Sequence, residues 1–121
     1  MANDPPSDLL GRLPSAETAI VQQAKICEYL LSMNHPIGRF KGTFFGALGY
    51  TIERWERLQT DLLQLAQSGK AVRGQESPYG QKHEVRGTLV GPSGRGADLV
   101  TVWIVLHGET SPQLVTAFPG E

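Results

Sequence analysis

Apolar residues in the first half of the chain recur every three or four positions, which predicts three helices. The first helix is expected to begin after Ser15, a favourable N-cap residue, and to end by Asn34, because a proline follows shortly afterwards. The second is expected over about residues 39–48. The third has the most regular leucine spacing, follows Thr51 as its N-cap and ends at Gly69.

The second half of the chain alternates between apolar and polar positions, as β-strands do. Strands are expected at residues 82–89, 99–106 and 113–118, whereas the polar residues 70–80 read as a loop. The middle strand is almost entirely apolar, which predicts a central strand covered on both sides. Short connections imply antiparallel pairing. The predicted fold is α+β, with about three N-terminal helices packed on a C-terminal antiparallel meander of three or four strands.

The length of 121 residues is typical of one domain. With 40% hydrophobic and 19% charged residues, the chain has enough apolar surface to form a core. Residues 1–14 are rich in proline and polar residues and are expected to be a disordered tail. Residues 15–121 then form a single domain.

Cys27 is the only cysteine, which excludes an intrachain disulfide and disfavours a cysteine metal site. No histidine–carboxylate spacing typical of a metal site is present, and the glycine-rich residues 91–96 lack the lysine of a P-loop. We therefore expect neither metal nor cofactor. The start of the chain lacks the pattern of a signal peptide, and no apolar run approaches the roughly 20 residues of a membrane span. A cytoplasmic location without membrane contact is expected.

The formal net charge of −1 and the pI near 6.3 argue against a protein that coats nucleic acid non-specifically. The charge is uneven along the chain, however. Residues 35–48 contain Arg39 and Lys41 and no acidic residue. A local basic surface is therefore compatible with the acidic pI.

His35 is the first candidate for chemistry, because an imidazole titrates near neutral pH as a general acid or base must. Arg39 and Lys41 follow it closely and are suited to stabilising a phosphate or a developing negative charge. Two structural alternatives stay open. His35 could cap the first helix, and Lys41 could be an ordinary solvated lysine.

Further candidates lie on the predicted strands. Thr101 and Trp103 share one face of the central strand, where a hydroxyl could orient a phosphate and an indole could stack on a base. Thr116 lies on the last strand. Arg86 lies on the first strand, on the face opposite His83. The alternative for Trp103 is a place in the core, as is usual for large aromatic residues on central strands.

Several short motifs resemble those of a family of uncharacterised bacterial domains with the pattern HPxGxxKxxFFxxLG. Here that pattern is His35-Pro36-Ile37-Gly38-Arg39-Phe40-Lys41-x-x-Phe44-Phe45-x-x-Leu48-Gly49. The family continues with YG, GPxG, TVWI and PxLVTAxP. These correspond to residues 79–80, 91–94, 101–104 and 112–119.

Domains of this kind occur at the C-terminal tips of bacterial polymorphic toxins and as short proteins beside small partner genes. Their layout is similar to that of barnase/colicin/RelE-type ribonucleases, so the resemblance implies metal-independent RNA cleavage through the ribose 2′-hydroxyl. It implies His35, Lys41 and Thr116 as catalytic residues. Arg39, Arg86, Thr101 and Trp103 would contact the RNA.

The chain starts with its own methionine and without a delivery module, so we expect the toxin half of a pair inhibited by a small cognate antitoxin or immunity protein. The alternative is a non-enzymatic protein-binding module, either an inactive relative or half of a two-protein complex. The acidic pI and the scarcity of catalytic groups favour this alternative.

Overall fold

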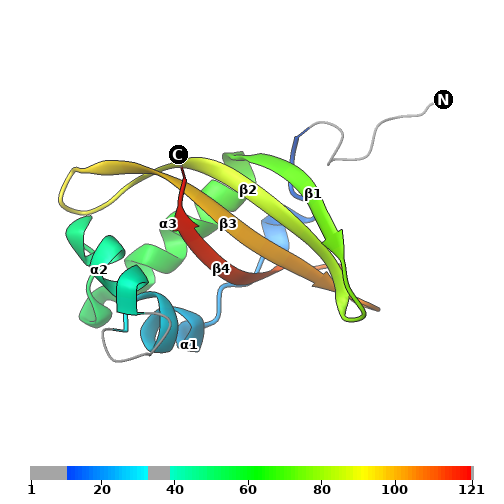
Figure 1. Ribbon diagram of the computed structural model, residues 1–121, viewed down its shortest axis with the longest axis horizontal. Coiled ribbons are helices and arrows are strands. Elements are labelled where there is room, and N and C mark those ends of the chain that lie inside the picture. The colour runs from blue at the N-terminus through cyan, green and yellow to red at the C-terminus, as the bar shows by residue number, and fades with distance from the viewer. Residues whose placement is uncertain (1–10, 33–38, 121) are drawn as a thin grey trace.

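A computed structural model describes residues 11–32 and 39–120 (Figure 1). The helical elements come first and the strands follow, which confirms the predicted α+β order. The helical elements are η2 (Ala16–Thr18), α1 (Gln23–Lys25), the π-helical turn η3 (Ile26–Leu30), α2 (Arg39–Ala47), η4 (Ile52–Arg54) and α3 (Trp55–Ser68). The strands are β1 (Lys70–Glu76), β2 (Gly80–Val90), β3 (Gly96–Leu106) and β4 (Gln113–Pro119).

The strands form one antiparallel sheet in the order β1-β2-β3-β4, so the meander has four strands. The prediction of a loop over residues 70–80 is wrong, because β1 occupies most of that segment. Only Ala71 of β1 is buried, while the other six residues are exposed. A strand that is solvated on both faces has no alternation of apolar and polar residues by which it could be recognised.

The first predicted helix is interrupted. Ser15 has the left-handed φ of 55° and makes no capping bond with its side chain. The chain is then extended at Ile20, whose N–H donates to Pro112 O (2.8 Å) and whose carbonyl accepts from Leu114 N (2.9 Å). This bridge covers the start of β4, an edge strand that would otherwise expose unpaired backbone groups.

Residues 11–14, which we placed in the tail, belong to the packed domain. The Leu13 side chain is only 3% exposed, and Gly11 O accepts a hydrogen bond from Ala71 N (2.8 Å). Residues 11–14 therefore lie against the beginning of β1.

The third helix follows its prediction closely at the C-terminal end. Thr51 precedes the short turn η4 and makes no side-chain capping bond, so α3 begins only at Trp55. It ends at Ser68, before Gly69. A Cβ atom on Gly69 would lie 2.7 Å from both Arg86 O and Val85 Cγ1, so glycine allows the close approach of α3 to β2.

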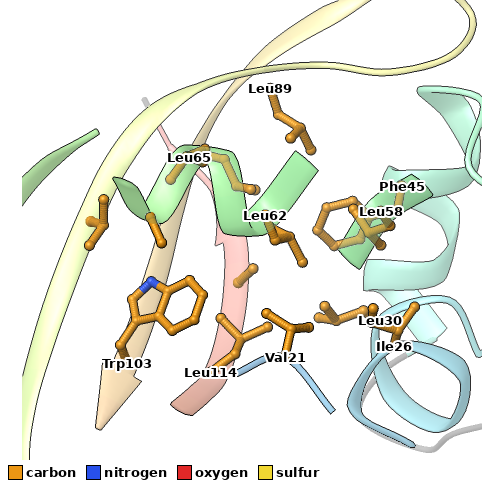
Figure 2. Packing of buried hydrophobic residues seen from close by; sticks show 14 of the residues in the cluster. Val21, Ile26, Leu30, Phe45, Leu58, Leu62, Leu65, Leu89, Trp103 and Leu114 are labelled. Atoms are coloured by element: carbon orange, nitrogen blue, oxygen red, sulfur yellow. The ribbon is translucent and has the colours of Figure 1, made fainter. Parts of the chain in front are cut away.

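The core lies between the sheet and one helical layer. Figure 2 shows Leu58 and Leu62 of α3 beside Phe45 of α2, with Trp103 on the sheet side of the same cluster. The prediction that β3 is covered on both sides is wrong, because Val102 and Ile104 remain partly exposed. Within the described residues, no helix combines the length and the apolar character needed to cross a membrane.

Candidate functional site

The alternation of side chains along the strands separates the candidate residues into two groups. Thr101 and Trp103 are completely buried on the face that α3 covers. Arg86 pairs with Val100, and Thr116 pairs with Val102. Val100 and Val102 directly precede Thr101 and Trp103, so the side chains of Arg86 and Thr116 point to the opposite face of the sheet. We call this opposite side, which carries Arg86 and Thr116, the outer face of the sheet.

Lys41 connects α2 to the edge of the sheet. Its Nζ donates to Ala117 O on β4 at 3.0 Å. The same ammonium lies 5.7 Å from the ring centroid of Tyr29 and 5.6 Å from that of Phe118, within range of cation–π attraction. Because an ammonium group has three N–H donors, this arrangement leaves capacity to bind a phosphate oxygen.

Tyr29 links Lys41 to Thr116. The hydroxyl groups of Tyr29 and Thr116 are 3.2 Å apart, and Lys25 Nζ lies 5.3 Å from the centroid of the tyrosine ring. The structure thus brings together two of the three predicted catalytic residues around a third residue that the sequence did not single out. We call Lys25, Tyr29, Lys41 and Thr116 the Tyr29 cluster.

Arg86 shares the outer face with Thr116 but belongs to β2, so β3 lies between them. Its side chain is 59% exposed, and Nη2 lies 3.6 Å from Glu84 Oε1. An exposed ion pair of this length contributes little to stability. Arg86 is therefore an exposed cation on the outer face, two strands away from Thr116.

Thr101 and Trp103 form part of the core, as the structural alternative for Trp103 anticipated. Trp103 Nε1 donates to Thr101 Oγ1 (2.7 Å), which in turn donates to Val85 O (2.8 Å). All of these side chains are buried, so neither Thr101 nor Trp103 is accessible to RNA. His83 is also buried, on the face opposite Arg86 as alternation requires.

His35 lies outside the described residues. Of Arg39, the structure gives only the backbone position at the start of α2. Cys27 is partly buried. Burial, reinforced by the Glu28 and Glu56 carboxylates, raises the pKa of its thiol and disfavours the reactive thiolate.

The described part of the chain contains no cluster of potential metal ligands. Among residues 11–32 and 39–120, no three His, Cys, Asp or Glu side chains are grouped so that they could hold a metal ion. The chemistry available at the Tyr29 cluster is that of ammonium and hydroxyl groups. Such groups bind and neutralise oxyanions.

A search of curated proteins gives no match. Among solved structures, the chain is similar to one from the contact-dependent growth inhibition toxin–immunity protein complex of Klebsiella pneumoniae 342. The match has a TM-score of 0.65 and 16% sequence identity, and it covers 88% of this chain and 97% of that one. At this identity the likeness shows a shared fold. The profile of the domain of unknown function DUF6883 matches residues 12–121, and the chain therefore belongs to this family.

Proposed function

We propose that this protein is a metal-independent endoribonuclease of the toxin type, restrained by a small partner protein. The observation that carries the proposal is the convergence of Lys41 and Thr116 on Tyr29, where β4 meets α2. Arg86 supplies a further cation on the outer face of the sheet, which also carries Thr116.

The proposed reaction is an internal displacement at phosphorus. The ribose 2′-oxygen loses its proton to a base and attacks the adjacent phosphorus, while the bond to the 5′-oxygen breaks and that oxygen receives a proton. The products are a 2′,3′-cyclic phosphate and a 5′-hydroxyl. His35 is the proposed acid or base, because imidazole exchanges protons near neutral pH.

The Tyr29 cluster would stabilise the charge that develops on the phosphate. Lys41 Nζ neutralises it, and the Thr116 hydroxyl, held by Tyr29, donates to a phosphate oxygen. Arg39 and Arg86 are proposed to hold adjacent phosphates. Thr101 and Trp103 take no part, because both are buried.

The shared fold supports a partner protein, since the similar chain comes from a toxin–immunity protein complex. The β1–β2 hairpin supports the same idea, because it projects beyond the helical layer (Figure 1). It exposes Val72 by 61% and Tyr79 by 75%. These apolar side chains also favour the second candidate function, a non-enzymatic module that acts by binding another protein.

RNA cleavage by the purified protein in EDTA tests the enzyme proposal. Wild type should cut total RNA or transfer RNA, and His35→Ala should slow cleavage by about 10²–10⁴-fold, as is usual for loss of a general acid or base. Lys41→Met should slow it by about 10²–10³-fold, as expected for loss of charge stabilisation.

The matched control is Arg73→Met, which removes one positive charge from β1 on the face of the sheet opposite Arg86. It should retain wild-type cleavage. If folded wild type cuts neither RNA, the enzyme proposal fails and the binding module becomes the favoured function. If cleavage survives both His35→Ala and Lys41→Met, the site is misplaced.

A further inference from the structure

A cavity separate from the Tyr29 cluster lies where the end of α2, the start of α3 and the β2–β3 connection meet. Its volume is about 350 Å³, within the range of small-molecule sites. The two sites share no residue. The lining consists of Gly49, Tyr50, Thr51, Arg54, Arg57 and Pro92.

The lining of this cavity is positively charged. Arg54 and Arg57 contribute two guanidinium groups, and none of the lining residues is acidic. Arg54 ends η4 and Arg57 lies in the first turn of α3, and both residues line the cavity. Two planar guanidinium groups facing one cavity suit an oxyanion, which each can bind through paired N–H donors.

Arg57 is held in a fixed orientation by Asp61, which does not line the cavity. Its Nε donates to Asp61 Oδ2 at 2.9 Å, and the Tyr50 hydroxyl donates to the same oxygen at 2.6 Å. This contact uses one of the five N–H groups of the guanidinium and leaves its terminal amino groups for a ligand. Asp61 offsets part of the charge of Arg57, whereas Arg54 adds its charge in full.

The walls of the cavity are preformed by contacts of the backbone. Ser93 N donates to Leu48 O at 3.0 Å, which joins the β2–β3 connection to the end of α2. Gly49 has a φ of 100°, and a Cβ atom there would lie 2.6 Å from Ser93 N. A site that is already shaped loses little entropy when a ligand binds.

We propose that this cavity binds the phosphate group of a small phosphomonoester, such as a nucleoside monophosphate. The number of hydrogen-bond donors favours phosphate over carboxylate. Two guanidinium groups and the Thr51 hydroxyl offer more donors than two carboxylate oxygens require, while the oxygens of a phosphate monoester can use them all. Pro92 and the Tyr50 ring supply an apolar wall for the remainder of the ligand.

Calorimetric titration with inorganic phosphate and with adenosine 5′-monophosphate, at constant ionic strength, tests the proposal. Both probes should bind saturably to the wild type and raise its melting temperature. Arg54→Gln and Arg57→Gln should each weaken binding by about 10-fold or more, the effect of losing one charge-assisted contact. Since Arg57→Gln also leaves Asp61 without its cation, the exposed Arg54 provides the variant that should stay fully folded.

Arg73→Gln is the matched control, because Arg73 is an exposed arginine on β1 and does not line the cavity. It should bind both probes as the wild type does. Tighter binding of the nucleotide than of inorganic phosphate would show that the cavity also contacts the nucleoside. Absence of saturable binding to the wild type, or equal affinity in folded Arg54→Gln, would overturn the site. The measurement contains no RNA, so its outcome is independent of ribonuclease activity.

Discussion

The hydroxyl groups of Tyr29 and Thr116 lie 3.2 Å apart, although 87 positions separate the two residues in the chain. Tyr29 belongs to the π-helical turn η3 and Thr116 to the edge strand β4. The contact therefore forms only when the helical layer docks on the sheet. Lys41 joins it from α2 and donates to the residue that follows Thr116. The candidate site and the packing of the helical layer depend on the same contacts.

Substitutions at Tyr29 separate the contribution of its hydroxyl from that of its ring. Tyr29→Phe removes the bond to Thr116 and retains the ring beside Lys25 and Lys41, so the free energy of unfolding should fall by about 1 kcal/mol. Tyr29→Leu also removes both cation–π contacts and should cost about 1 kcal/mol more. Urea denaturation followed by circular dichroism measures both changes. Identical unfolding midpoints for the two variants would show that the ring contacts contribute nothing.

The buried hydrogen bonds around Thr101 predict a larger effect. Thr101→Val leaves both the Trp103 indole N–H and the Val85 carbonyl without their partner in the core, so unfolding should become easier by about 1–3 kcal/mol. Thr88→Val is the control, because it removes an exposed hydroxyl bonded to Asp98 at 3.1 Å. It should cost less. If the proposed RNA binding is measured per folded molecule, Thr101→Val should leave it unchanged. Weaker RNA binding by the folded variant would show that Thr101 belongs to the RNA site after all.

Periodicity was sufficient to predict the elements that bury a regular face. The leucine spacing of α3, the alternation of β2 and the apolar run of β3 predicted the type and order of these elements, because buried positions are occupied by apolar residues. β1 has only one buried residue, so its sequence shows no spacing of apolar residues from which a strand could be predicted. Ser15 and Thr51 looked like N-caps, yet neither makes a capping bond. At Ser15, pairing of the following residues with β4 overrides the local preference.

The candidate site was predictable only in part, for a similar reason. Alternation shows that Thr101 and Trp103 share a face, but only the docking of α3 decides that this face is the core. Lys41 and Thr116 could be named from their motifs. Tyr29 could not, since it sits in an apolar helical stripe, and its role arises from contacts between distant segments.

The glycines near α2 predict effects of opposite sign. A Cβ atom on Gly91 would collide with the carbonyl oxygen of Leu48, so Gly91→Ala should destabilise the protein by about 1–3 kcal/mol. Gly46 lies in the exposed part of α2 with nothing within 4 Å of an added Cβ, so Gly46→Ala should stabilise it by up to about 1 kcal/mol. Thermal unfolding compares the two variants with the wild type. A melting temperature of Gly46→Ala below that of the wild type would contradict the absence of neighbouring atoms around an added Cβ at Gly46.

The environment of Tyr50 predicts a loss of stability at alkaline pH. Burial, followed by the hydrogen bond and the negative charge of Asp61, raises the pKa of the Tyr50 hydroxyl well above its ordinary value. Above about pH 10, this tyrosine loses its proton in the unfolded chain but keeps it in the folded protein. The folded state then binds more protons, so the free energy of unfolding should decline by up to about 1.4 kcal/mol per pH unit through this one group.

Tyr50→Phe removes the titrating hydroxyl, so its stability should decline less steeply than that of the wild type over the same range. The difference in unfolding free energy between the two proteins should be constant at neutral pH, where the hydroxyl is protonated in both states, and should narrow from about pH 9 to about pH 11. Tyr79→Phe changes an exposed side chain in the β1–β2 turn and should keep the wild-type slope. Urea denaturation at several pH values measures these slopes. Parallel curves for the wild type and Tyr50→Phe across the whole range would mean that burial and Asp61 do not hold the proton on Tyr50.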